Sequence, residues 1–269
     1  MPGRRCRCRD DDAESVVKLF HIRGRRLKRR IAKGDDELAA RVLQNFHNEA
    51  NLTASLNHPN IINVIECATL PNATPYFVMP YLPDTLATRI WPLHLQPFLK
   101  TPYLDRRIEP ICAAETVAIL QGLLSALDAV HKVGVVHRDI KPNNILISNG
   151  GRPVLCDFGC ARMASGESIT WRSRFGVLPF VSPEQRSAPS SVDFRADVYS
   201  IGVIAYLMLA GQAPQPLGES SSLIADWVDK ELANWVMTLI DPDPNNRPTD
   251  ARETLIALQA AVGTHVLLT

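Results

Sequence analysis

The stretch Val136-His137-Arg138-Asp139-Ile140-Lys141-Pro142-Asn143-Asn144-Ile145-Leu146 places a carboxylate, a lysine and an amide at short spacings between apolar ends. A second carboxylate follows in the tripeptide Asp157-Phe158-Gly159. Apolar runs at 135–136, 145–147 and 154–156 border both segments, and they predict strands that anchor polar loops on a rigid base. Either aspartate alone would be read as an ordinary turn residue. The whole set at this spacing predicts a single polar site.

The two segments together read H-R-D-x-K-x-x-N and D-F-G, and they resemble the catalytic and magnesium-binding loops of the protein kinase family. The resemblance implies that Asp139 accepts the proton of the attacking hydroxyl and that Lys141 lies near the transferred phosphate. Asn144 and Asp157 offer the hard oxygen ligands that suit Mg²⁺. Lysine at position 141 favours serine/threonine over tyrosine substrates. The expected reaction is therefore transfer of the γ-phosphoryl group of ATP to protein serine or threonine hydroxyls.

The same resemblance implies an α+β, two-lobed protein-kinase-like fold. Its small N-terminal lobe is rich in strands, and its C-terminal lobe is mainly helical. The resemblance covers about residues 14 to 260, which is nearly the whole chain. It implies a protein substrate and ATP with Mg²⁺.

The segment 15–20 predicts a strand that resembles the lysine strand of the family, with Lys18 against the α- and β-phosphates. A helix predicted at about 36–56 has Glu49 on a stripe that is otherwise largely apolar. A carboxylate that points inward needs a cation, because burying it alone is costly. We expect Lys18 to be that cation. The alternative is that Glu49 lies at the edge of the stripe in solvent.

The segment 75–79 predicts a strand that leads into residues resembling the hinge between kinase lobes. The resemblance implies that Met79 is the gatekeeper and that the backbone of Pro80 and Leu82 faces adenine. Proline at that position keeps its carbonyl, which is the acceptor that the adenine amino group needs. The prolines within 87–111 disfavour a long helix, so an extended loop is predicted there.

Three longer helices are predicted in the expected C-terminal lobe, at 113–132, 193–211 and 226–240. Asp197, near the start of the second, resembles the family aspartate that braces the catalytic loop. Arg247 resembles the family arginine that pairs with a glutamate, here Glu184, and pins the activation segment.

Three hydroxyl residues in the predicted activation segment are candidate phosphorylation sites: Ser168, Thr170 and Ser173. A phosphate there has a candidate partner in Arg138, since a doubly charged group opposite an arginine orders a loop.

The expected organisation is a disordered tail at 1–13, a truncated N-terminal lobe at 14–80, a hinge at 81–86, a C-terminal lobe at 87–262 and a tail at 263–269. A kinase carries a G-x-G-x-x-G loop before its lysine strand. In this sequence only Gly3 precedes Lys18, so the first strand and the loop are expected to be missing. That departure supports an alternative function, a kinase-like scaffold that binds nucleotide weakly and acts through protein contacts. The basic run within 23–33 predicts a solvated insert, an import signal or a dock for an acidic partner.

Composition excludes several classes of protein. The 269 residues carry a net charge of +1, so no attraction to nucleic acid is implied. The six cysteines form no paired framework, which favours reduced thiols and an intracellular location, cytoplasmic or nuclear. The apolar run at 201–210 is too short to span a bilayer, so no membrane segment is expected. We expect a monomer.

Overall fold

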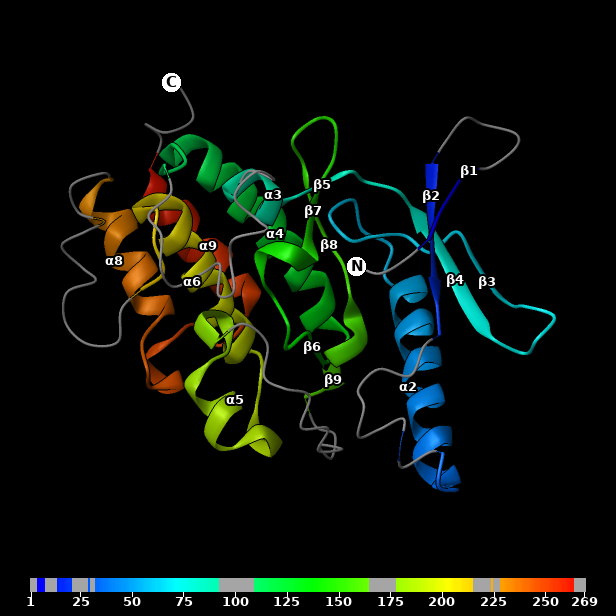
Figure 1. The fold of residues 1–269 in the computed structure, drawn as a ribbon. Coiled ribbons are helices and arrows are strands. Elements are labelled where there is room, and N and C mark those ends of the chain that lie inside the picture. Colours follow the sequence, from blue (N-terminus) through cyan, green and yellow to red (C-terminus); the bar gives the residue numbers. More distant parts are fainter. Residues whose placement is uncertain are drawn as a thin grey trace.

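The computed structural model of the chain describes residues 4–7, 14–20, 29, 32–91, 109–164, 178–214, 224 and 228–263. Two lobes lie side by side (Figure 1). An antiparallel sheet and one long helix form the N-terminal lobe, whereas helices dominate the C-terminal lobe. The two-lobed fold predicted from the sequence is confirmed.

The N-terminal sheet has the strand order β1-β2-β4-β3, and all of its pairs are antiparallel. Its strands are β1 (Arg4–Arg7), β2 (Glu14–Leu19), β3 (Glu66–Thr69) and β4 (Pro75–Pro80). The inner strand β4 carries the buried Phe77, Val78 and Met79, and Lys18 of β2 lies opposite Phe77. The lysine strand is therefore placed beside the apolar centre of the lobe.

The prediction of a disordered tail at 1–13 is wrong for Arg4–Arg7. These residues form β1, which pairs with β2 from Arg4 opposite Val17 to Arg7 opposite Glu14. The charged composition predicted disorder, but pairing at a sheet edge uses backbone N–H and C=O groups that every non-proline residue has. A strand therefore precedes the lysine strand, where the sequence suggested that it would be missing.

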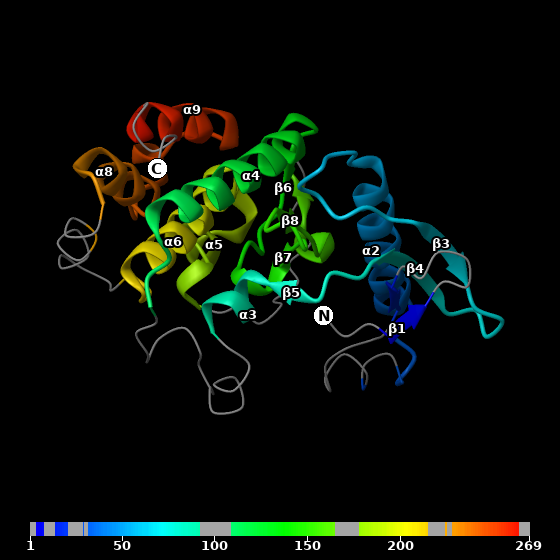
Figure 2. The same ribbon diagram turned by 90° about the horizontal axis from the view of Figure 1, so that it is seen from above.

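Helix α2 (Asp36–Ser55) lies against the sheet, as Figure 2 shows from above. It begins after Asp35, whose side chain accepts a hydrogen bond from the Leu38 N–H at 3.1 Å, a typical N-cap contact. Phe46 of α2 packs on Phe77 of β4 with ring centroids 5.3 Å apart. The same apolar cluster includes Leu146 and Val154 of the C-terminal lobe, so one small cluster spans the boundary between the lobes.

The prediction of an extended loop from residue 87 is wrong at its start. Strand β5 (Asp84–Thr85) is followed directly by helix α3 (Leu86–Ile90). Thr85 and Thr88 form a reciprocal capping box, which stabilises a short helix before the first proline at position 92. The rest of that predicted loop, 92–108, lies outside the described residues.

Long helices build the C-terminal lobe: α4 (Ala113–Lys132), α6 (Arg195–Ala210), α8 (Lys230–Leu239) and α9 (Ala251–Val262). Its short elements are β6 (Val135–Val136), β7 (Ile145–Ile147), β8 (Pro153–Leu155), β9 (Arg162–Met163) and helix α5 (Pro183–Ser187). Helix α8 begins at Lys230, later than the predicted start at 226, and Asp229 occupies its N-cap position. Helices α4 and α6 lie where the sequence predicts helices, at 113–132 and 193–211.

Helix α4 is long and apolar enough to cross a membrane by length and composition alone. Half of that stretch is buried inside the molecule, and α4 packs against α6, α9 and β8. Leu120, Leu124 and Leu127 are fully covered. This packing identifies α4 as a core helix of the C-terminal lobe, and it delivers the chain to β6 and the loop that follows.

Candidate functional site

The loop after β6 is held in a strained backbone conformation. Arg138 has a φ angle of +66°, in the left-handed region that side chains other than glycine rarely adopt. The fully buried Asp197 accepts hydrogen bonds from the backbone N–H groups of His137 at 2.7 Å and Arg138 at 2.8 Å. The predicted bracing contact of Asp197 is confirmed, and it offsets the cost of the turn.

His131 adds a further contact that sequence reasoning missed. Its Nε2 lies 3.2 Å from a carboxylate oxygen of Asp197. Its Nδ1 accepts the Ala251 N–H at 3.1 Å, so the proton must be on Nε2, which donates to Asp197. One signal was available, because His131 lies in the last turn of the helix that leads into the loop.

The side chain of Asp139 lies at the centre of this loop. Lys141 Nζ donates to its two oxygens at 2.8 and 2.6 Å. The amide nitrogen of Asn144 donates to one of the same oxygens at 2.9 Å and to the Asp139 carbonyl at 2.8 Å. The three predicted catalytic residues are thus brought together in one cluster.

The hairpin of β7 and β8 places the second carboxylate next to this cluster. Its strands pair from Ile145 opposite Leu155, directly after Asn144 and just before Asp157. The Cys156 N–H donates to the Asn144 carbonyl at 3.0 Å, which closes that end of the hairpin. Asn144 and Asp157 therefore emerge side by side, although they are separated by a dozen residues in the sequence.

Lys18 joins the two lobes at this point. Its Nζ contacts Glu49 Oε1 and lies 2.9 Å from Asp157 Oδ1. Glu49 is 7% exposed, so the alternative of a solvated glutamate at the helix edge is wrong and the predicted ion pair is confirmed. A Cβ on Gly159 would lie 3.3 Å from Glu49 Oε2 and 3.4 Å from Asp157 Oδ1, so glycine leaves room for both carboxylates.

The electrostatics of this triad follow from two carboxylates that share one ammonium group. Burial lowers the pKa of Lys18, but the attraction of Asp157 and Glu49 outweighs burial, and the pKa is raised. Burial raises the pKa of Glu49, and Lys18 only partly offsets it. For Asp157 the attraction of Lys18 outweighs burial, and the pKa is lowered. Asp157 is thus the carboxylate held ionised.

Asn144 and Asp157 fit a divalent cation. Since the amide nitrogen of Asn144 is committed to Asp139, its oxygen is left as the acceptor. The Asp157 side chain keeps 32% of its surface exposed while Lys18 holds one oxygen. An amide oxygen and an ionised carboxylate are ligands that Mg²⁺ accepts. The described residues contain no group of three or more His, Cys, Asp or Glu side chains that could hold a metal alone.

The predicted hinge residues line the junction of the lobes. Met79 is 4% exposed and packs in one cluster with Phe77, Leu146 and Val154. Pro80 ends β4 opposite Ser15, and Leu82 packs against the same cluster. Their proposed contacts with adenine stay predictions.

The pairing predicted between Arg247 and Glu184 is confirmed as a bidentate contact at 2.7 and 3.0 Å. Glu184 lies in α5, so this contact ties the end of the predicted activation segment to the loop before α9. The candidate phosphorylation sites Ser168, Thr170 and Ser173 lie outside the described residues.

Comparisons with known proteins agree with this geometry. A family model described as a protein kinase domain matches residues 6–259. The chain is 30% identical over 239 residues to the probable serine/threonine-protein kinase PknB of Lactococcus lactis, covering 83% of this chain and 35% of that protein. It is 34% identical over 187 residues to the serine/threonine-protein kinase PknK of Mycobacterium bovis, covering 69% of this chain and 16% of that protein.

A third relative, the serine/threonine-protein kinase pkn2 of Myxococcus xanthus, is 28% identical over 264 residues, covering 88% of this chain and 29% of that protein. The chain therefore spans about a sixth to about a third of the length of these relatives.

Proposed function

This chain belongs to the protein kinase domain family, and we propose that it transfers the γ-phosphoryl group of ATP to serine or threonine hydroxyls of protein substrates. One observation carries the proposal. Lys18 contacts both Glu49 and Asp157, so the lysine strand, α2 and the β7–β8 hairpin meet at one charged point between the lobes. Phosphoryl transfer depends mainly on such positioning of charge, because the protein has little covalent chemistry to do.

Each residue of the cluster has a role in this proposal. Asp139 accepts the proton of the attacking hydroxyl. The Nζ of Lys141 lies 2.6 Å from the Asp139 carboxylate, which is near enough to stabilise charge on the transferred phosphate. Asn144 and Asp157 hold Mg²⁺, which neutralises phosphate charge when bound. Lys18, oriented by Glu49, contacts the α- and β-phosphates. The hinge backbone at Pro80 and Leu82, next to Met79, receives adenine.

The scaffold alternative is not favoured. Its support was the missing glycine-rich loop, and residues 8–13 between β1 and β2 contain no glycine. Against it stand the assembled charged cluster and the resemblance to several serine/threonine kinases.

Cys67, Cys112, Cys156 and Cys160 are free thiols, which supports a reducing, intracellular location.

The test is phosphate transfer from radiolabelled Mg-ATP to myelin basic protein by the purified chain. We expect Asp139→Asn to lower the turnover rate by about 10²–10⁴-fold, because a general base contributes about that factor. Asp128→Asn is the matched control, since Asp128 forms an ion pair with the surface Lys132 and contacts none of the site residues in the described part of the chain. The assignment fails if Asp139→Asn keeps more than about a tenth of the control rate.

Phosphorylation of the activation segment is a second part of the proposal. Burial lowers the pKa of Arg138, and repulsion from the nearby Arg162 lowers that pKa further. A phosphate on Ser168, Thr170 or Ser173 would relieve that repulsion. We expect the triple alanine variant to lose the activation that an upstream kinase produces in the wild type, measured as turnover before and after treatment. Equal activation of both proteins would contradict this regulatory assignment.

A further inference from the structure

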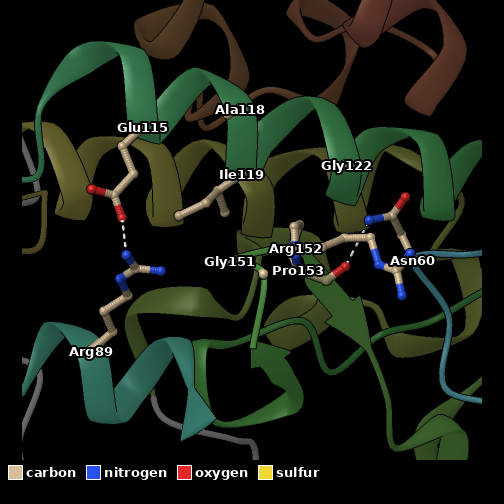
Figure 3. A pocket seen from close by; sticks show the side chains of 10 residues that line it. Asn60, Arg89, Glu115, Ala118, Ile119, Gly122, Gly151, Arg152 and Pro153 are labelled. Carbon is tan, nitrogen blue, oxygen red and sulfur yellow. Dashed lines mark hydrogen bonds and ion pairs between the residues drawn. The ribbon is translucent and has the colours of Figure 1, made fainter. Parts of the chain in front are cut away.

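A cavity of about 410 Å³ lies between α4, α3 and the turn that joins β7 to β8 (Figure 3). Its longest wall is one face of α4, where the lining positions 115, 118, 119 and 122 recur at helical spacing. None of its lining residues belongs to the charged cluster between the lobes, which consists of Lys18, Glu49, Asp139, Lys141, Asn144 and Asp157. The volume is within the range of small-molecule sites, about 300–1,000 Å³.

The two ends of the cavity differ in charge. At one end Arg89 Nη2 lies 2.7 Å from Glu115 Oε1, so these two charges compensate each other. Figure 3 shows Arg152 at the opposite end, beside Asn60. Within the described ranges Arg152 makes hydrogen bonds only through its backbone, to Ser148, and its guanidinium has no acceptor. Two arginines and one glutamate leave the lining with a charge of +1.

The middle of the cavity is apolar. The side chains of Ala118, Ile119 and Pro153 line it between the two charged ends. A ligand that fits must therefore combine an anionic group with a short apolar body.

The mouth of the cavity is open at the turn. Gly150 and Gly151 line the cavity at the turn, and a Cβ added at either would meet no atom within 4 Å, so the space beside the turn is open. On the opposite side the wall is tight, because a Cβ on Gly122 would lie 2.7 Å from Pro153 Cγ. A ligand can reach Arg152 from solvent and cannot pass between α4 and β8.

We propose that this cavity binds a small organic acid, with its carboxylate on the Arg152 guanidinium and its apolar body against Ala118 and Ile119. A guanidinium presents paired N–H donors that match a carboxylate, and a charge-assisted pair is stronger than a neutral hydrogen bond. The site is separate from the proposed ATP site, so acid and nucleotide bind at the same time.

Isothermal titration calorimetry with 3-phenylpropanoate tests the proposal. We expect saturable binding with a Kd of about 1 mM or tighter, as a ligand of this size allows. The uncharged 3-phenylpropanamide, and the acid with Arg152→Gln, should each bind about tenfold or more weakly. Ala118→Trp, which fills the cavity from an exposed helix position, should abolish binding.

Two controls make the result decisive. Arg41→Gln alters an exposed arginine of α2, remote in the fold, and should leave the affinity unchanged. Saturating Mg-ATP should also leave it unchanged. The proposal is overturned by the absence of saturable binding to the wild type, by equal binding to Arg152→Gln, or by displacement with Mg-ATP.

Discussion

Arg247 donates hydrogen bonds from all three nitrogens of its guanidinium group. Its side chain is fully buried, and its three nitrogens donate to Glu184 twice and to the carbonyls of Asp241, Pro242 and Arg195. Five N–H groups with five acceptors leave no unpaired donor, which is the condition under which a buried charge is tolerated. A lysine would supply three donors from one point and could not match this set.

The stability of this contact should depend on pH. Burial raises the pKa of Glu184, but hydrogen bonds from Arg247 and the backbone outweigh burial, and the pKa is lowered from its ordinary value of 4.5. A carboxyl group with a lowered folded-state pKa adds stability that is complete above its unfolded-state pKa and is lost as pH falls through the folded one. The difference in unfolding free energy between wild type and Glu184→Gln should therefore shrink as pH falls from about 5 to about 3.

Urea denaturation followed by tryptophan fluorescence at several pH values measures this difference. Glu253→Gln is not a suitable control, since the pKa of Glu253 is also lowered by its bonds to Thr249. Glu37→Gln on the exposed surface of α2 is suitable. A difference in unfolding free energy that stays constant over this pH range would show that the ionised form of Glu184 does not stabilise the folded protein.

At the scale of elements, α6 and α8 pack so closely that one helix position tolerates only glycine. A Cβ on Gly202 of α6 would lie 2.6 Å from Leu239 Cβ and 2.8 Å from Ile240 Cγ2. Helix propensity alone favours alanine over glycine by about 1 kcal/mol. Overpacking a core costs about 1–3 kcal/mol, so packing should outweigh propensity.

We therefore expect Gly202→Ala to lower the free energy of unfolding by about 1 kcal/mol or more, measured by urea denaturation. Gly150→Ala is the matched control, because a Cβ there meets no atom within 4 Å and its φ is not in the left-handed region. That variant should remain within about 0.5 kcal/mol of the wild type. A stabilised Gly202→Ala protein would mean that α8 moves aside at little cost.

For the whole molecule, the two lobes are coupled by one lysine and by a shared core. Lys18 contacts Glu49 within the N-terminal lobe and Asp157 in the C-terminal lobe. Phe77 and Met79 pack with Leu146 and Val154 across the same boundary. A ligand that binds at this junction contacts both lobes and should stabilise the folded state of the whole chain by mass action.

Thermal unfolding with and without Mg-ATP tests this coupling. The wild type should be stabilised by about 2.7 kcal/mol at a nucleotide concentration 100-fold above Kd. Lys18→Met should lose most of that effect and be less stable without ligand, because Glu49 and Asp157 are left close together without their cation. Lys132→Met, which alters a lysine that is 58% exposed, should behave as the wild type. A full Mg-ATP shift in Lys18→Met would refute the assigned role.

The sequence by itself determined the family, the grouping of Asp139, Lys141 and Asn144, and the pairing of Lys18 with Glu49 and of Arg247 with Glu184. Those residues are marked by fixed spacing or by a charge on an apolar helix face, and both signals are local. Only the tertiary structure decided that Arg4–Arg7 pair with β2, that His131 reaches Asp197, and that Arg152 lines a cavity with Arg89 and Glu115. The contacts of His131 and Arg152 join segments far apart in the chain, and no local pattern of side chains encodes which distant group will lie beside them. The pairing of β1 with β2 is local, but it is made by backbone groups, which the side-chain pattern does not encode.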